Sequence, residues 1–244
     1  RQFKRLGVWM DWDDPYITFT PRYMEAGWHS LKKAHEAGLL VQDLRVVHWC
    51  PRCETALAEH EVRGEYEDRE DPSIYLKFKL KDRKEEYILV WTTTPWTLPS
   101  NILVMVKPEF RYARVRVGKE IWILAEALVD TAMGKIGIKD YQVVETLLGT
   151  QLEGLRYVHP LLEQVPKQKE WADKFHRVVA AEYVDLEEGT GCVHTAPGHG
   201  EEDFEVGREV GAPIFSPLDA GGRFTEDGGR YKGMYVKDAD PVVV

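Results

Sequence analysis

The fold of this chain is constrained most by a series of short apolar runs that have the period of β-strands. In residues 74–80 apolar side chains alternate with Tyr75, Lys77 and Lys79, which is the pattern of a strand with one buried face. Further candidate strands are residues 86–91, 102–106, 112–117, 121–125, 142–147, 178–184 and 192–194. Many short strands with few helices predict a closed or nearly closed β-barrel, so we expect an α/β chain in which a β-barrel dominates.

Few helices are expected beside these strands. Thr20 and Pro21 suit an N-cap and a first helical position, and Gly38 is placed to end the helix that they begin. Shorter helices are expected at residues 126–135 and 201–209.

Charge and composition argue against several classes of function. The net charge of −9 disfavours a surface that grips nucleic acid broadly, because phosphate contacts need clustered lysine and arginine. It still allows one flexible nucleic-acid end to be held in a pocket. No apolar run reaches the roughly 18 residues of a membrane span, and no secretory leader is visible. With three cysteines and no disulfide framework, the sequence predicts a cytoplasmic protein with no membrane partner.

The ends of the chain suggest part of a longer protein. It starts at Arg1 rather than at methionine and stops on the apolar residues 241–244, so we expect an excised piece. Asn101 is the only asparagine, a depletion that is typical of proteins from thermophiles.

Residues 91–101 form the first chemically loaded stretch and read Trp-Thr-Thr-Thr-Pro-Trp-Thr-Leu-Pro-Ser-Asn. They follow the apolar residues 87–90, so a strand is expected to end in a polar loop stiffened by proline. Uncharged hydroxyls suit the holding of a ligand or of a water beside it. Threonine and tryptophan are also ordinary strand and core residues, so this stretch taken alone fits a structural role equally well.

Residues 194–204 form the second stretch and read His-Thr-Ala-Pro-Gly-His-Gly-Glu-Glu-Asp-Phe. In one interpretation His194, His199 and Asp203 ligate a metal ion such as zinc. In another, Asp203 binds a cationic group and a histidine shapes the pocket wall. Acidic residues in the first turn of a helix are also favoured by the helix dipole without any ligand.

Taken together, residues 91–101 and the second stretch extended back to Gly189, residues 189–204, closely resemble the editing domain of the isoleucyl-tRNA synthetases, the connective polypeptide inserted in the class I catalytic fold. Thr94 stands where the valyl and leucyl relatives typically carry arginine, and this favours the isoleucyl type. Residues 7–16 and 49–57 resemble the stretches that lead into the insertion. The His-Ile-Gly-His and Lys-Met-Ser-Lys-Ser motifs of class I activation are absent from the sequence, so we do not expect this chain to form an adenylate or to charge tRNA.

The resemblance implies an editing-domain fold with short flanking segments of the catalytic domain. The implied segments are a helical lead-in at 1–47, a Cys-x-x-Cys knuckle and linker at 48–70, the editing barrel at 71–225 and a return segment at 226–244.

The implied activity is hydrolysis of mischarged valine, as valyl-tRNA(Ile) or valyl-adenylate, with the tRNA 3′ end and the remainder of the synthetase as partners. By resemblance, Asp203 anchors the ammonium group of the amino acid and His194 excludes isoleucine. Thr92, Thr93 and Thr94 are the expected catalytic residues together with Asp203. The other residues expected to bind substrate are Trp91, Trp96, Thr97 and His199. Two alternatives are a module that binds an aminoacylated tRNA end without hydrolysing it and a metal-dependent hydrolase.

The pair Cys50 and Cys53 has the spacing of half a zinc knuckle, and a structural site needs two further ligands. By resemblance those ligands lie beyond the end of this chain. We therefore expect no cofactor for editing, and zinc at Cys50 and Cys53 only in the full-length enzyme.

Overall fold

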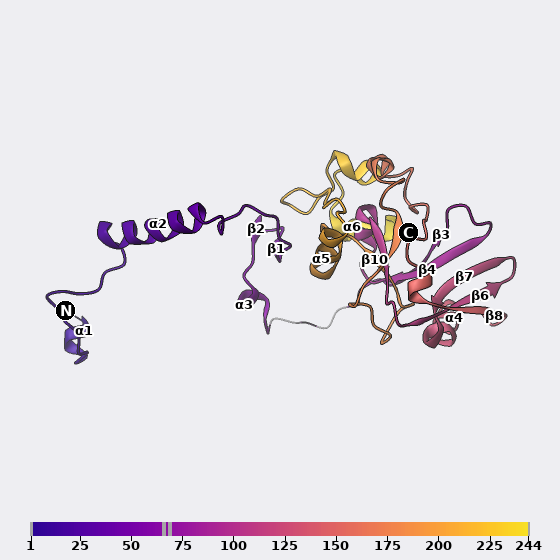
Figure 1. Ribbon diagram of the computed structural model, residues 1–244, viewed down its shortest axis with the longest axis horizontal. Coiled ribbons are helices and arrows are strands. Elements are labelled where there is room, and N and C mark those ends of the chain that lie inside the picture. The colour runs from indigo at the N-terminus through magenta and orange to yellow at the C-terminus, as the bar shows by residue number, and fades with distance from the viewer. Residues whose placement is uncertain (1, 65–66, 68–69, 244) are drawn as a thin grey trace. The chain divides into compact units, whose positions relative to one another are not determined.

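The chain forms two compact units, Arg1–Arg45 and Val46–Val244, in a computed structural model that describes residues 2–64, 67 and 70–243 (Figure 1). In the first unit α1 (Gln2–Arg5) precedes α2 (Pro21–Glu36), and neither helix has a buried residue. The Thr20 side chain accepts a hydrogen bond from the Tyr23 N–H at 3.4 Å, and Gly38 adopts a φ of +70°. Both predicted ends of this helix are therefore confirmed.

The second unit is built on an eight-stranded sheet with the order β8-β6-β7-β4-β10-β5-β9, and β3 pairs with β4 outside this path. The β4 strand pairs in parallel with both β7 and β10 and antiparallel with β3. The strands are β3 (Ile74–Lys79), β4 (Glu86–Thr92), β5 (Leu103–Val106), β6 (Arg111–Val117), β7 (Glu120–Ala125), β8 (Gln142–Leu148), β9 (Arg177–Ala180) and β10 (Cys192–Thr195).

Five of these strands close into a ring through the short segment at residues 154–158. Tyr157 forms an antiparallel bridge with Leu80 at the end of β3, and Arg156 forms another with Arg177 at the start of β9. The strands β3, β4, β10, β5 and β9 thereby surround one core, while β7, β6 and β8 continue from β4 as a curled sheet. The α/β fold dominated by a barrel-like sheet, as expected from the sequence, is confirmed.

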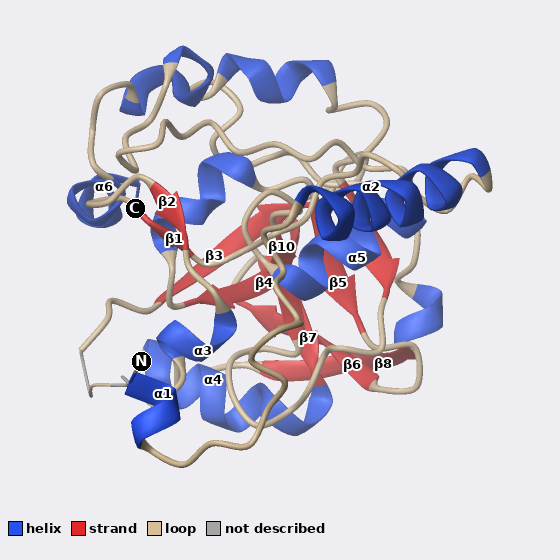
Figure 2. Cartoon of the chain, turned by 90° about the vertical axis from the view of Figure 1, so that its left-hand side faces the viewer, coloured by secondary structure: helices blue, strands red, loops and turns tan. Residues whose placement is uncertain are grey.

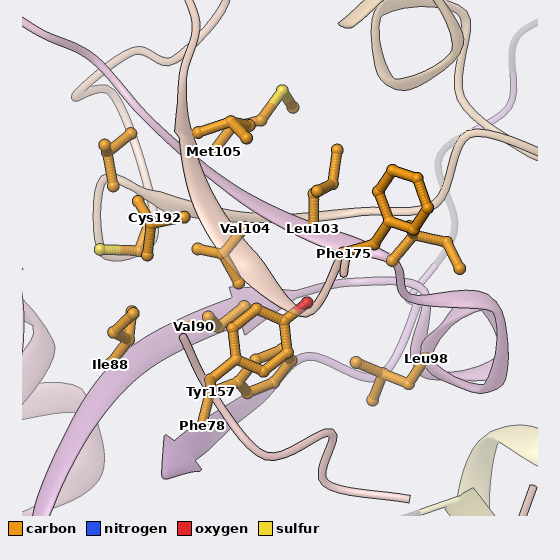
Figure 3. Close-up of a cluster of buried hydrophobic side chains, with 14 of the residues drawn as sticks. Phe78, Ile88, Val90, Leu98, Leu103, Val104, Met105, Tyr157, Phe175 and Cys192 are labelled. Carbon is orange, nitrogen blue, oxygen red and sulfur yellow. The ribbon is translucent and has the colours of Figure 1, made fainter. Parts of the chain in front are cut away.

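Alternation along β4 divides its apolar side chains between two cores. Ile88 and Val90 face the main core, which also contains Tyr157 (Figure 3). Leu89 belongs to a second core on the other face of the sheet, which is covered by α4 (Val129–Ile136). A strand buried on both faces has little freedom to shift its register, because a shift by one residue would exchange the two faces.

The expected strand at 178–184 is present but shorter, since β9 ends at Ala180. The Ala181 N–H still donates to Val106 O at 2.9 Å, and the chain then turns away from the sheet. The difference matters for the site, because residues 183–191 instead form part of a cavity wall.

Short helices cover the ends of the barrel. α5 (Glu201–Glu209) lies close to β10 in both views (Figures 1 and 2). α6 (Val236–Val243) contributes Val236, Ala239 and Val243 to the main core. The 3₁₀ helices are η1 (Pro95–Ser100), η2 (Glu126–Leu128), η3 (Gly149–Gln151), η4 (Pro166–Glu170) and η5 (Glu226–Tyr231). No helix in the described part of the chain is long and apolar enough to cross a membrane.

The cysteine knuckle lies in the second unit. It consists of β1 (Trp49–Cys50) paired with β2 (Thr55–Ala56), followed by α3 (Glu59–Val62). The Trp49 indole N–H donates to Ala220 O at 2.8 Å and so ties the knuckle to the barrel.

The predicted segment boundary at 47 lies near the division between the two units. The segment boundaries at 47, 70 and 225 all stay predictions. The residues from 226 onward pack against the barrel through α6.

The close approach of Gly191, which directly precedes β10, to the end of β7 leads to a first prediction. Gly191 has a φ of +68°, and a Cβ there would lie 2.5 Å from the Ala125 Cβ. We expect Gly191→Ala to lower the free energy of unfolding by about 2–5 kcal/mol, the sum of left-handed strain and overpacking. Urea denaturation measures this loss.

Gly118→Ala is the matched control, because Gly118 has a φ of +60° and nothing lies within 4 Å of its added Cβ. It carries only the strain, about 1–2 kcal/mol. Equal losses for the two variants would contradict the close packing of Gly191 against the end of β7.

Candidate active site

The two chemically loaded stretches meet because β4 and β10 are neighbours that run in the same direction. Trp91 of β4 pairs with Val193 of β10, so both strands end on the same side of the sheet. The threonine loop, residues 92–97, leaves β4 there and passes into η1, which has Pro95 in its first turn. Residues 196–203 leave β10 at the same edge and enter α5. Strand adjacency thus joins side chains that lie a hundred residues apart.

A cavity of about 700 Å³ lies between these two segments. Its walls contain every substrate-binding or catalytic residue expected from the sequence, namely Trp91, Thr92, Thr93, Thr94, Trp96, Thr97, His194, His199 and Asp203. A third segment, residues 183–191, closes another side and was not expected at the site. The volume suits a ligand of the size of an amino acid joined to a nucleoside.

His194 is held in the cavity wall by hydrogen bonds at both ring nitrogens. Its Nε2 lies 2.8 Å from Thr97 Oγ1, and its Nδ1 lies 2.9 Å from the side-chain nitrogen of Asn101. Burial lowers the pKa of His194 to about 3, and the nearby His199 adds to the effect. The imidazole is therefore neutral at pH 7, and neither nitrogen is available to a ligand. It presents a rigid ring and not a base.

The threonine loop is organised by hydrogen bonds among its own residues. Thr97 Oγ1 donates to Thr94 O at 2.8 Å, and the Thr94 N–H donates to Thr92 Oγ1 at 3.1 Å. The Thr94 hydroxyl lies 3.3 Å from that of Thr92 and 3.4 Å from that of Thr97. Thr93 takes no part in these bonds and is exposed at the cavity. The loop therefore offers a fixed row of hydroxyl oxygens.

Asp203 lies in the first turn of α5 and turns back toward the end of β10. Its Oδ2 accepts a hydrogen bond from the Ala196 N–H at 2.8 Å. Within the described residues Oδ1 has no hydrogen-bonding partner. Gly200 makes this position possible, because a Cβ there would lie 2.8 Å from Oδ2. Burial raises the pKa of Asp203 to about 6, against the lowering effect of the Ala196 N–H, and Glu202 raises it further.

His199 and Trp96 form the wall next to Asp203. His199 Nε2 lies 2.9 Å from Ser100 Oγ, and its ring meets the Trp96 ring edge to face at a centroid distance of 5.1 Å. Burial lowers the pKa of His199 to about 4, so it too is neutral at pH 7.

The backbone of the loop is fixed from outside by α6. Asp240 is buried, and its Oδ1 accepts a hydrogen bond from the Trp96 N–H at 2.9 Å. Asn101 supports the site as well, through its contact with His194, and the Tyr157 hydroxyl donates to Asn101 Oδ1 at 2.6 Å. The sequence analysis gave no site role to Asn101, Tyr157 or Asp240. Only Asn101 carried a signal, as the single asparagine at the end of the first motif.

The cavity has an acidic wall. Asp185, Glu187, Glu188 and Glu202 line it together with Asp203, and none of the described residues that line it is lysine or arginine. This wall too was not predicted, because residues 185–188 have the composition of an ordinary surface turn.

Comparison with known proteins agrees with the resemblance seen in the motifs. Residues 1–187 match the family described as tRNA synthetases class I (I, L, M and V). The chain belongs to the class I tRNA synthetases. It is 58% identical over 250 residues to the isoleucine–tRNA ligase of Thermococcus kodakarensis and 59% identical over 250 residues to that of Pyrococcus horikoshii. The ligase of Methanocaldococcus jannaschii is 54% identical over 254 residues.

These matches cover 100% of this synthetase chain but only 23–24% of the relatives. The chain therefore spans about a quarter of their length.

Two solved structures resemble the chain in fold. The crystal structure of GlLeuRS-CP1 has a TM-score of 0.53 at 15% identity and covers 70% of this chain and 94% of its own. The P. knowlesi cytosolic leucyl-tRNA synthetase editing domain has a TM-score of 0.51 at 12% identity and covers 70% of this chain and 91% of its own. At such identities the likeness concerns the fold, and it confirms the editing-domain fold expected for this synthetase chain.

The histidines of the site are not arranged as metal ligands. The described residues contain no cluster of three histidine, cysteine, aspartate or glutamate side chains that could hold a metal ion. The interpretation of His194, His199 and Asp203 as a zinc site therefore has no support in the geometry of this synthetase chain.

Cys50 and Cys53 lie close together in the knuckle. The Cys53 N–H donates to Cys50 Sγ at 3.4 Å, and this bond lowers the pKa of the Cys50 thiol. The hydrogen bond between the two side chains raises the pKa of Cys53. The pair thus fits two of the four ligands of structural zinc.

The pKa of Asp203 predicts how the stability of the protein depends on pH. Because folding raises this pKa from 3.8 to about 6, the charge is disfavoured in the folded state, and its cost grows as the pH rises from about 4 to about 6. Asp203→Asn keeps an acceptor for the Ala196 N–H and removes the charge. We expect a higher melting temperature than wild type at pH 8 and an equal one at pH 4.

Glu201→Gln is the control, because Glu201 is exposed in the same turn and does not line the cavity. Its melting temperature is expected to follow that of wild type at both pH values. A lower melting temperature for Asp203→Asn at pH 8 would contradict the strained state of this carboxylate.

Proposed function

We propose that the cavity is an editing site that hydrolyses the ester of valyl-tRNA(Ile) within an isoleucine–tRNA ligase. The observation that carries this proposal is one cavity whose lining includes both a carboxylate oxygen free to bind an ammonium group and a rigid neutral imidazole. The relatives of the chain are isoleucine–tRNA ligases, and this supports the choice of amino acid.

Such a site is needed because a binding pocket discriminates poorly between apolar side chains that differ by one methylene. Valine lacks one methylene of isoleucine, and a pocket for the larger side chain rejects the smaller by only about 1–3 kcal/mol, a limit for which isoleucyl-tRNA synthetase is itself the standard example. A second site that admits only the smaller product and destroys it removes the remaining errors.

Asp203 supplies the grip on the amino acid. Its carboxylate forms a charge-assisted hydrogen bond with the α-ammonium group, which every amino acid carries whatever its side chain. The bound ammonium favours the ionised form, so binding lowers the raised pKa of this carboxyl. The strain of burying the charge is thus relieved when the ligand arrives.

His194 supplies the selection by size. Its ring is buried and bonded at both nitrogens, so it cannot turn aside to admit a larger side chain. An added methylene would have to displace this ring and break buried hydrogen bonds. Isoleucine is thereby excluded, whereas valine fits.

The threonine hydroxyls hold the ester carbonyl, the terminal ribose or the attacking water. Neutral hydroxyls are too weak as bases to take a proton from water at pH 7, and His194 and His199 have pKa values of about 3 and about 4. We propose that the free ribose hydroxyl next to the ester assists the water.

The charge of the walls favours the tRNA ester over valyl-adenylate. An adenylate places an anionic phosphate directly beside the reacting carbonyl, whereas the ester places a ribose there. The acidic residues 185, 187, 188 and 202 repel that phosphate, and among the described residues no lysine or arginine of the cavity offsets them. The adenylate is therefore the weaker of the two proposed substrates.

The proposal also includes partners outside the chain. The tRNA acceptor end brings the ester into the cavity, and the remainder of the synthetase supplies the tRNA-binding surface that an acidic chain of net charge −9 lacks. Zinc at Cys50 and Cys53 would cross-link the knuckle to a second ligand pair in the full-length enzyme and would take no part in hydrolysis.

Deacylation by the 244-residue chain tests the proposed activity. We expect valine release from valyl-tRNA(Ile) and none from isoleucyl-tRNA(Ile), and we expect Asp203→Ala to abolish the release. Asp185→Ala is the matched control, since it removes an exposed carboxylate from the same cavity and leaves the activity within about twofold of wild type.

Tight binding of valyl-tRNA(Ile) without any release would favour a non-hydrolytic binding module. Unchanged release by folded Asp203→Ala would contradict the anchor role.

Selection by His194 is tested by enlarging the pocket. We expect His194→Ala to hydrolyse isoleucyl-tRNA(Ile), because removal of the ring makes room for the additional methylene. Cys192→Ala removes a buried side chain two residues earlier on the same strand and controls for the loss of packing. If a folded His194→Ala variant still rejects isoleucyl-tRNA(Ile), His194 does not set the size limit.

A further inference from the structure

The hydrogen bonds behind the cavity form one continuous chain from Tyr157 to the threonine loop. The Tyr157 hydroxyl donates to Asn101 Oδ1 at 2.6 Å, and Asn101 Nδ2 lies 2.8 Å from Leu103 O and 2.9 Å from His194 Nδ1. His194 Nε2 then meets Thr97 Oγ1 at 2.8 Å. Tyr157, Asn101, His194 and Thr97 are all buried, so water does not compete for these bonds.

The chemistry of the two groups in each hydrogen bond determines which of them donates and which accepts. The Leu103 carbonyl can only accept, so the Asn101 amide must turn its nitrogen toward it and its oxygen toward the Tyr157 hydroxyl. The same nitrogen faces His194 Nδ1 and can only donate, so Nδ1 must be unprotonated. A neutral imidazole then carries its proton on Nε2.

The tautomer of His194 in turn directs the threonines. The Nε2–H donates to Thr97 Oγ1, and the Thr97 hydroxyl donates its own proton to Thr94 O at 2.8 Å. The Thr94 hydroxyl, 3.4 Å from Thr97 Oγ1, can donate to that oxygen as well. Thr97 Oγ1 then donates its one proton and accepts two hydrogen bonds within the wall, and the Thr94 hydroxyl, with its proton directed at Thr97, keeps a lone pair for a ligand in the cavity.

We propose that Tyr157 is a positioning residue that, together with Leu103 O, holds Asn101 in the orientation that sets the tautomer of His194, and so fixes the polarity of the threonine row. Tyr157 does not line the cavity and lies on the segment that closes the barrel between β3 and β9. Its ring packs against Phe78 at a centroid distance of 5.1 Å, and Figure 3 shows it within the main core. The closure of the barrel and the chemistry of the site are therefore linked through one phenol.

Loss of the phenol would leave Asn101 Oδ1 without its donor and so weaken the hold on the amide. In Tyr157→Phe its oxygen can face His194 Nδ1, which then holds the proton, and Nε2 accepts from Thr97 instead of donating to it. Thr97 would then no longer donate to Thr94 O. The bond to Leu103 O still opposes the turn, so we expect a mixture of the two tautomers.

Ring nitrogen-15 spectra of His194 in the 244-residue chain, without substrate, test the inference directly. In wild type we expect Nδ1 to resonate as an unprotonated nitrogen and Nε2 as a protonated one, with His194→Ala identifying the signals. In Tyr157→Phe the two resonances move toward each other. The matched control is Tyr231→Phe, because Tyr231 is buried in the same core, and no hydrogen bond joins its hydroxyl to the described residues of the network.

A protonated Nδ1 in wild type, or unchanged resonances in folded Tyr157→Phe, would overturn the proposal. If Tyr157→Phe does not fold, Asn101→Asp provides the second variant, because a carboxylate only accepts and requires a protonated Nδ1. Unchanged tautomers in that variant would equally contradict the inference.

The expected effect of Tyr157→Phe on the selection of valine over isoleucine rests on the proposed editing function. We expect the ratio of kcat/KM for valyl-tRNA(Ile) over isoleucyl-tRNA(Ile) to fall about 5- to 10-fold in Tyr157→Phe, the effect of one lost buried hydrogen bond, and to stay unchanged in Tyr231→Phe. An unchanged ratio in Tyr157→Phe would contradict the positioning role. A chain that has the expected tautomer and releases no valine would contradict the proposed function alone.

Discussion

The parallel contact between β4 and β10 is the interaction on which the site depends. It places Trp91 beside Val193, and the two strands then release the threonine loop and the Asp203 segment at one edge of the sheet. β4 is buried on both faces, between the main core and the core under α4, so its register has little freedom. The position of the site is therefore set by apolar packing that takes no part in its chemistry.

Burial has opposite consequences for His194 and Asp203, two residues of the same cavity. Around His194 every ring nitrogen has a partner, so burial there costs little and produces a rigid wall. Around Asp203 burial raises the pKa of the carboxyl to about 6 and so disfavours its charged form, and Oδ1 has no hydrogen-bonding partner within the described residues. A buried carboxylate oxygen without a hydrogen-bond donor lowers the stability of the protein, but a site that binds an ammonium group requires such an oxygen.

Much of this arrangement follows from the sequence, and the remainder depends on contacts that leave no local pattern. The period-two runs predict the strands, and the two motifs name the residues that meet at the cavity. β9 ends earlier than its apolar run, because the chain after Ala181 turns into the cavity wall. Tyr157 and Asp240 act through single hydrogen bonds to partners 56 and 144 residues away, and no spacing rule signals such bonds.

A crystal structure with a non-hydrolysable analogue, in which an amide joins valine to adenosine, tests the central claim most directly. The account predicts that the ammonium group lies within hydrogen-bonding distance of Asp203 Oδ1, with the valine side chain against the His194 ring and the linking carbonyl beside the threonine loop. A ligand that touches only one of the two segments, or one whose side chain points away from His194, would contradict it.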